Sequence, residues 1–228
     1  MHESVFRSPS GNVPVFPLPG VVFFPRTVLP LHVFEPRYRA MVRDAMAGEG
    51  LIAVSLLLPG WESTYESSPA FHEVGTIGRI EDLEPLPDGR YNLRLVGMCR
   101  AALGDVVRWR PYRVTRARRL SESDLDEGCP TLHARKVELL AAHGCLLREL
   151  VPDAAPGVVL DEKIPFESAV NGACANLPVD AELRQRLLEE DDLLERHRKA
   201  TCILNEVLER VFRLKALRSG HGSGADVN

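Results

Sequence analysis

The apolar residues of this chain of 228 residues change their spacing once, at the acidic stretch Ser121–Gly128. Before this stretch, short runs of β-branched and aromatic residues are separated by glycine and proline, which is typical of strands. After it, apolar residues recur every three or four positions, which is typical of amphipathic helices. Strands followed by helices predict an α+β fold, β-rich in its first half and helical in its second.

The first half contains strand-like runs at Val13–Phe16, Val21–Phe24, Val28–Val33, Leu51–Leu58, Val74–Leu83, Arg90–Leu103 and Arg110–Leu120. Asp88-Gly89 separates two of these runs and supplies the residues with positive φ that a tight hairpin needs. Because proline donates no hydrogen bond to a sheet ladder, four early prolines predict strand edges or corners: Pro17, Pro19, Pro25 and Pro30.

Helical spacing occurs once in the first half and throughout the second. Pro36 suits a first helical position, and Gly48 can end that helix. In the second half Asp180 can cap a helix, and a longer apolar seam runs from Leu193 to Leu214. That seam needs partners, most simply the preceding helices and the β-rich part. Residues 1–12 and 219–228 are polar or rich in glycine and serine, which predicts flexible ends.

Composition favours a cytoplasmic protein without a membrane partner. The five cysteines are odd in number and share no repeated spacing, which argues for reduced thiols rather than a disulfide framework. No apolar run approaches the length that crosses a bilayer. The predicted organisation is therefore a flexible start (1–12), a β-rich part (13–120), a helical part (121–218) and a flexible tail (219–228).

Familiar catalytic and metal-binding patterns are missing from the sequence. It contains no phosphate-binding loop with its Gly-Lys pair and no G-x-S-x-G motif, and His72-Glu73 lacks the second histidine of a zinc-binding helix. A further set offers thiolates and imidazoles in mixed pairs without zinc-knuckle spacing: Cys129, His133, His143 and Cys145. We expect no catalytic residue, no metal and no cofactor.

A polar segment at Pro59–Phe71 carries aromatic residues that suit recognition. Trp61, Tyr65 and Phe71 are rigid rings on a connecting segment, and such rings bury much area at low entropic cost. The alternative is that they fold back as a lid over the strands. Both interpretations remain open from the sequence alone.

A second segment, Arg108–Arg119, interleaves six arginines with Trp109 and Tyr112. Basic side chains beside aromatic rings can bind phosphates and stack on bases, so RNA binding is an alternative function. The net charge of −4 and the acidic stretch that follows favour a solvated strand face instead. We therefore do not expect a nucleic-acid partner.

Three stretches, in this order, resemble the N-terminal domain of Lon proteases. They are PLPGVVFFPRTVLPLHVFEPRYRAM, EVGTIGRIEDLEPLPDGRYNLRLVGMCRA and LPVDAELRQRLLEEDDLLERHRKATCIL. The first is similar to the family's opening signature, the second to its hairpin and the third to the start of its closing helices. The resemblance covers Val13 to Leu217, which is nearly the whole chain.

The resemblance implies a PUA-like β pseudo-barrel with one inserted helix, followed by an α-helical bundle that ends in a long helix. It also implies a non-catalytic module that binds unfolded or extended polypeptide, or acts as an adaptor for a protease or chaperone partner. The sequence leaves the oligomeric state open between a monomer and a weak dimer. Neither the ATPase module nor the Ser/Lys peptidase region of full-length Lon is recognisable, so we expect no enzyme activity. The candidate contact residues are Trp61, Tyr65, Phe71, Phe23, Phe34 and Trp109.

Overall fold

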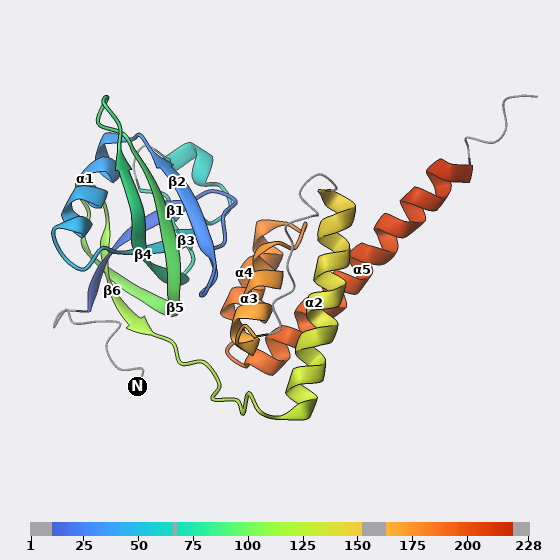
Figure 1. The fold of residues 1–228 in the computed structure, drawn as a ribbon. Helices are drawn as coiled ribbons and strands as arrows, with labels where there is room; N and C mark the ends of the chain where they lie inside the picture. Colours follow the sequence, from blue (N-terminus) through green and yellow to red (C-terminus); the bar gives the residue numbers. More distant parts are fainter. Residues whose placement is uncertain (1–10, 66–67, 152–162, 221–228) are drawn as a thin grey trace, which may run out of the picture. The chain divides into compact units, whose positions relative to one another are not determined.

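The computed structural model describes residues 11–65, 68–151 and 163–220, and Figure 1 shows their arrangement into strands and helices. The strands are β1 (Asn12–Leu18), β2 (Val28–Val33), β3 (Leu51–Leu56), β4 (Val74–Pro85), β5 (Tyr91–Arg108) and β6 (Val114–Arg119). The helices are α1 (Pro36–Met46), the 3-10 helix η1 (Trp61–Thr64), α2 (Pro130–Leu150), α3 (Phe166–Ala175), α4 (Ala181–Glu189) and α5 (Leu193–Gly220). The predicted α+β fold is confirmed.

The chain forms two compact units. The described parts of residues 1–123 and 179–192 form what we call the barrel unit, and those of residues 124–178 and 193–228 form the helical unit. The segment 179–192 carries α4, which the sequence division at residue 120 places with the later helices. Gln185 of α4 donates from Nε2 to the carbonyl oxygen of Val74 at 2.9 Å, and this bond joins the helix to β4.

The sheet of the barrel unit closes on itself. Its described strands lie in the order β2-β5-β4-β3-β1-β6, and β5 also pairs with β6, so five strands form a ring with β2 outside it. β1 and β3 run parallel, and the other pairs are antiparallel. A strand of 18 residues, β5, makes closure possible because it reaches β2, β4 and β6.

The proline pattern follows from how β1 changes partners. β1 pairs with β6 as far as Pro14 and with β3 from Val15 onward. Pro17 therefore lies where β1 has β3 as its one partner strand, so its missing N–H group breaks no bond to a second strand. Pro30 lies in β2, an edge strand, as predicted. The predicted strand at Val21–Phe24 is wrong, because this segment forms no ladder. The side chains of Val22, Phe23 and Phe24 are nevertheless buried, and Thr76 Oγ1 donates to the carbonyl oxygen of Phe23 at 2.5 Å.

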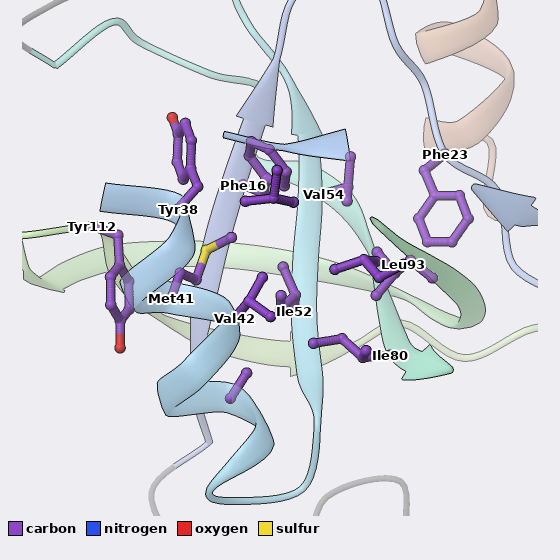
Figure 2. Close-up of a cluster of buried hydrophobic side chains, with 13 residues drawn as sticks. Phe16, Phe23, Tyr38, Met41, Val42, Ile52, Val54, Ile80, Leu93 and Tyr112 are labelled. Atoms are coloured by element: carbon purple, nitrogen blue, oxygen red, sulfur yellow. The ribbon is translucent and has the colours of Figure 1, made fainter. Parts of the chain in front are cut away.

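The hairpin and the first helix are confirmed. Gly89 adopts a φ of 77° between β4 and β5, and its amide donates to the carbonyl oxygen of Leu86 at 2.9 Å. Pro36 begins α1, whose apolar face packs against the sheet in a cluster that includes Met41, Val42 and Ile52 (Figure 2). This helix therefore supplies the apolar cover for one part of the ring.

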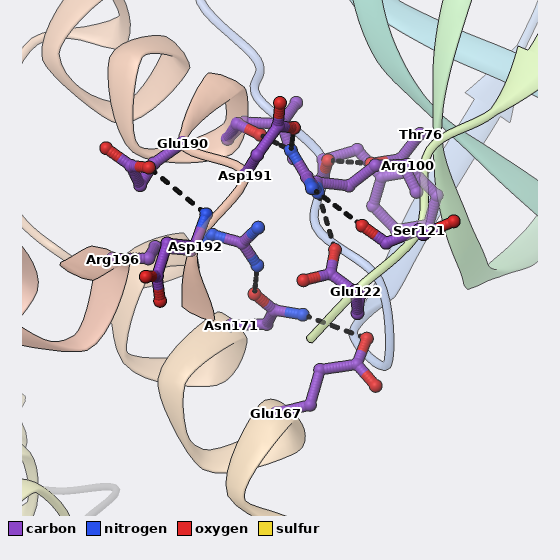
Figure 3. Close-up of polar contacts among 12 residues, drawn as sticks. Thr76, Arg100, Ser121, Glu122, Glu167, Asn171, Glu190, Asp191, Asp192 and Arg196 are labelled. Atoms are coloured by element: carbon purple, nitrogen blue, oxygen red, sulfur yellow. Dashed lines mark hydrogen bonds and ion pairs between the residues drawn. The ribbon is translucent and has the colours of Figure 1, made fainter. Parts of the chain in front are cut away.

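A buried arginine joins three segments of the barrel unit. Arg100 of β5 is fully buried and donates from Nε to Oε1 of Glu122 at 2.5 Å (Figure 3). Its Nη1 donates at 3.0 Å to the carbonyl oxygen of Leu188 and at 3.0 Å to Oδ1 of Asp191. Arg100 thus holds the chain after β6 and the end of α4 against the barrel.

The helical unit packs α2, α3 and α5 around apolar side chains such as Leu139, Phe166 and Leu204. A buried polar contact within it runs from Nη1 of Arg196 to Oδ1 of Asn171, at 2.9 Å (Figure 3). The predicted seam of α5 is buried only in its first half, because Leu214 is 58% exposed. Among the described residues, no helix is both long and apolar enough to cross a membrane.

Candidate functional site: two pockets around Trp109

The segment between β3 and β4 is tied to the start of α1. The rings of Trp61 and Tyr65 meet edge to face, with centroids 5.5 Å apart. The Tyr65 hydroxyl donates to Oε1 of Glu35 at 2.6 Å. Arg37 pairs with Glu35 at 2.8 Å and its guanidinium lies 5.1 Å from the centre of the Tyr65 ring. This part of the segment is therefore anchored by contacts of its own rather than being a free loop.

The electrostatics of this anchor keep Tyr65 neutral. Burial, followed by the hydrogen bond to Glu35, raises the pKa of Tyr65 to about 12. The hydroxyl therefore stays protonated at neutral pH and remains committed to Glu35. What Tyr65 and Trp61 can offer to a ligand is the part of each half-buried ring that faces solvent.

Arg113, next to β6, holds the end of the same segment. Its Nη1 donates to the carbonyl oxygen of Pro69 at 2.5 Å, and its guanidinium lies 4.7 Å from the centre of the Phe71 ring. The side chain is only 9% exposed. Burial is the main cause that lowers the pKa of Arg113, with the nearby charge of Arg37 acting in the same direction. The group nevertheless remains a cation at neutral pH, because arginine does not deprotonate in proteins.

Trp109 stands between two pockets of the barrel unit. It is 57% exposed and lies in the turn from β5 to β6. The first pocket, of about 630 Å³, is lined by Trp109, Arg110, Arg113, Arg37 and Tyr38 among others. The second pocket, of about 470 Å³, shares Ser68, Trp109 and Arg113 with the first and is also lined by Phe71. We call these the arginine pocket and the Phe71 pocket.

A third pocket, of about 670 Å³, lies where α1 approaches the turn from β5 to β6 and is lined by Asp44, Glu49, Arg108 and Tyr112 among others. The Tyr112 hydroxyl donates to Oδ2 of Asp44 at 2.6 Å, and the Arg108 guanidinium lies 4.4 Å from the centre of the Tyr112 ring. Asp44, Arg108 and Tyr112 are thus engaged with one another. Unlike the other two pockets, it has no exposed aromatic ring among its described lining residues.

The six predicted contact residues fall into four groups, the last of which is Phe23 alone. Trp61 and Tyr65 touch each other, and Phe71 and Trp109 line a common pocket. Phe34 is 59% exposed and stacks on His32 with ring centroids 6.2 Å apart, but it lines none of the three pockets described here.

Phe23 is buried in the core of the barrel unit, so the prediction that it is a contact residue is wrong. It is 4% exposed, and a Cβ atom at Gly78 would lie 2.9 Å from Cε1 of its ring. A side chain at position 78 would collide with this ring, so the glycine provides the space that the Phe23 ring fills. The core burial of Phe23 explains its aromatic character without a ligand.

Comparison with known proteins identifies the family. The model of the ATP-dependent protease La (LON) substrate-binding domain matches residues 12–206. The chain belongs to the LON substrate-binding domain family. The resemblance seen in the sequence is thereby confirmed.

Among its relatives are the Lon protease of Chloroflexus aurantiacus, 32% identical over 192 residues, and that of Flavobacterium johnsoniae, 26% identical over 203 residues. These alignments cover 82% and 88% of this chain but only 22% and 24% of the relatives. The chain therefore spans about a quarter of the length of the curated relatives it matches.

Two solved structures of LON domains have the same fold. A Lon N-terminal domain protein from Xanthomonas campestris is 28% identical with a TM-score of 0.57, and the match covers 85% of this chain and 97% of that one. The N-terminal domain of the Mycobacterium avium complex Lon protease is 20% identical with a TM-score of 0.62, covering 85% and 98%. At that identity the second match supports the fold alone.

Within this LON domain, sequence reasoning missed the residues that shape the arginine pocket. It assigned Arg113 to a solvated strand face with the other arginines of 108–119, and it gave Arg37 and Tyr38 no role beyond the first helix. Five of the six arginines are indeed exposed, namely Arg108, Arg110, Arg116, Arg118 and Arg119. Arg113 is the exception, and it is buried beside Tyr112. Two consecutive buried residues break strand alternation, so no periodic signal could have identified Arg113.

The described residues of this LON domain include two pockets with exposed ring surface and a shared arginine. No group of three or more histidine, cysteine or acidic side chains among the described residues is placed to hold a metal ion. The arginine and Phe71 pockets instead combine exposed ring surface, buried cation and backbone carbonyl groups. Such a combination can bind an apolar side chain and fix the polar groups beside it.

Proposed function

We propose that this LON domain is a non-catalytic recognition module that binds unfolded or extended polypeptide at the two pockets around Trp109. The family supports a role in substrate recognition. The observation that carries the proposal is Trp109 itself, which is 57% exposed yet lines both the arginine pocket and the Phe71 pocket. Delivery of the bound polypeptide to a protease or chaperone partner would be the adaptor form of the same function.

The size and spacing of the pockets suit an extended chain. Their volumes of about 630 and 470 Å³ fall in the range of about 300–1,000 Å³ that ligand pockets occupy. Because they share Trp109, successive side chains of an extended segment could enter the two pockets while the indole packs on the backbone between them. An exposed indole favours such binding, since tryptophan is enriched at the positions that contribute most to interfaces.

The test is binding of a permanently unfolded protein, for example reduced and carboxyamidomethylated α-lactalbumin, measured by fluorescence anisotropy. Trp109→Ala should weaken binding by about tenfold or more, the effect expected for a central aromatic contact. Phe34→Ala is the matched control, because Phe34 is exposed to a similar extent, 59%, and lies outside both pockets. Equal affinity of the wild type and Trp109→Ala would refute the proposal.

The double variant Trp61→Ala/Tyr65→Ala tests whether the anchored segment belongs to the same surface. If these rings contact the polypeptide, the variant should bind more weakly than the wild type while the Phe34→Ala control does not change. Equal affinity would remove the two rings from the binding surface and leave the pockets as the site.

RNA binding is tested in the same assay. Replacing the exposed Arg116 and Arg118 by glutamate should abolish a salt-sensitive RNA complex if one forms. Under our proposal, this variant binds unfolded polypeptide as the wild type does, because neither residue lines the arginine or the Phe71 pocket.

A further inference from the structure

The barrel unit contains two buried arginines with opposite surroundings. Arg100 is paired with the carboxylates of Glu122 and Asp191. Arg113 is 9% exposed, yet within the described ranges no carboxylate forms an ion pair with it. Among the described residues, it contacts the carbonyl oxygen of Pro69 and the face of the Phe71 ring. Burying a cation without a counter-ion costs free energy, so an uncompensated guanidinium in a pocket calls for a functional explanation.

The charges around Arg113 differ between the two pockets that it lines. Arg37 and Arg110 join it in the arginine pocket, whose lining within the described residues includes no aspartate or glutamate. Among the described residues that line it, the Phe71 pocket has Arg113 as its one arginine, and it is also lined by Glu73 and Asp105. An anion is therefore favoured on one side of Trp109 and repelled on the other.

Of the three arginines in the arginine pocket, one is already engaged. Arg37 pairs with Glu35 at 2.8 Å, which compensates its charge. Arg110 is exposed at the mouth, so water screens its charge. Arg113 alone is both buried and without a recorded carboxylate, and a low local dielectric strengthens its attraction for an anion.

We propose that the arginine pocket binds the side-chain carboxylate of an aspartate or glutamate within an extended polypeptide, with Arg113 as the anchor. This rests on the proposed function and names its substrate class: acidic residues with an apolar neighbour that packs on Trp109. A side-chain carboxylate fits better than a terminal one, because the two pockets share Trp109 and Arg113 and a bound segment can continue from one into the other. Glu73 and Asp105 would disfavour the reverse direction, in which the acidic residue enters the Phe71 pocket.

The experiment compares two short peptides, both acetylated and amidated, that differ only by glutamate or glutamine between a leucine and a phenylalanine. Their affinities for the full chain are measured by fluorescence anisotropy at low salt. We expect the glutamate peptide to bind about tenfold more tightly than the glutamine peptide, because charge-assisted hydrogen bonds to arginine are about twice as strong as neutral ones. Trp109→Ala should weaken both peptides.

Two arginine variants test which arginine causes the difference in affinity between the glutamate and glutamine peptides. Arg113→Gln should bring the two affinities close to equal while leaving that of the glutamine peptide near the wild-type value. Arg110→Gln should narrow the difference only in part. Because Arg110 is exposed, this variant also keeps the test valid if Arg113→Gln fails to fold by circular dichroism. Arg118→Gln, an exposed arginine outside both pockets, is the control and should preserve the full difference.

The outcomes separate this inference from the proposed function. If both peptides bind equally and both need Trp109, polypeptide recognition stands and the carboxylate anchor is refuted. If neither peptide binds and unfolded protein does not bind, the proposed function itself fails. A third peptide with glutamine and a free C-terminal carboxylate tests the other source of the anion. Tight binding of this peptide alone would overturn the assignment to a side chain.

Discussion

Replacing Arg100 by methionine tests whether one buried guanidinium holds the barrel unit together. Methionine fills a similar volume without charge or donors. The change removes the bonds to Glu122 Oε1, to Asp191 Oδ1 and to the carbonyl oxygen of Leu188. These acceptors lie on the segment that follows β6 and at the end of α4. Loss of the three bonds should therefore loosen both segments from β5 at once.

The size of the effect follows from the exposure of each partner. The Glu122 side chain is 19% exposed and would become a partly buried carboxylate without its cation, whereas that of Asp191 is 79% exposed and can be solvated. Breaking a buried ion pair from one side costs about 3–5 kcal/mol. Because Asp191 recovers its hydration and Glu122 is only partly buried, we expect the lower end, about 3 kcal/mol of unfolding free energy.

The assay is urea unfolding followed by tryptophan fluorescence. Both tryptophans, Trp61 and Trp109, lie in the barrel unit, so the signal reports on that unit. The double variant Arg100→Met/Glu122→Gln should recover part of the lost stability, because it also removes the negative charge that Arg100 balances. A loss below about 1 kcal/mol for Arg100→Met would show that the bonds of Arg100 exchange for water at little cost, and would refute the reasoning.

Further predictions concern packing, thiol reactivity and pH. Gly97→Ala should destabilise the barrel unit by about 1–3 kcal/mol in the same urea assay, since its Cβ would lie 2.4 Å from the carbonyl oxygen of Phe24. Cys129 should react with iodoacetamide well before Cys174 in a mass-spectrometric time course. Backbone amides at the start of α2 lower the pKa of Cys129, whereas burial raises that of Cys174 to about 12. The helical unit should lose thermal stability as pH falls from about 7 to 5, because burial lowers the pKa of His143 and the unfolded chain takes up a proton first. Circular dichroism should show a weaker loss for His143→Gln, and an equal loss would exclude His143 as the cause.

Much of the fold could be predicted from local signals. Asp88-Gly89 marks a hairpin because few residues accept a positive φ, and Gly89 has a φ of 77°. Asp180 marks the start of α4 because its carboxylate can accept an amide, and it accepts that of Leu183 at 2.6 Å. Both signals lie within a few residues of the structure they determine.

Features that depend on distant partners escaped prediction. Val21–Phe24 has the composition of a strand, but its backbone bonds go elsewhere, as in the bond from Thr76. The seam of α5 continues past Leu208, yet burial stops there, because periodicity shows which side chains share a face and not whether a partner covers it.

The candidate site was predictable only in part for the same reason. The sequence pointed to four aromatic residues on connecting segments: Trp61, Tyr65, Phe71 and Trp109. In the structure, the rings of Tyr65 and Phe71 each contact an arginine, and Trp109 lines the arginine pocket. The sequence could not show that Phe23 turns inward, since that depends on the space beside Gly78. Nor could it show the arginine pocket, which arises only when residues from α1, β1 and the turn after β5 meet.

The two buried arginines show how a site can be told from a core. Arg100 and Arg113 are the same residue type, both follow or lie in β5, and both are withdrawn from water. The counter-ions of Arg100 come from 22 and 91 residues away, so its pairing becomes visible only in the folded chain. A buried cation with its carboxylates in place is accounted for by stability. Arg113, which lines two pockets and has no recorded carboxylate among the described residues, is better accounted for by an anion that arrives with a ligand.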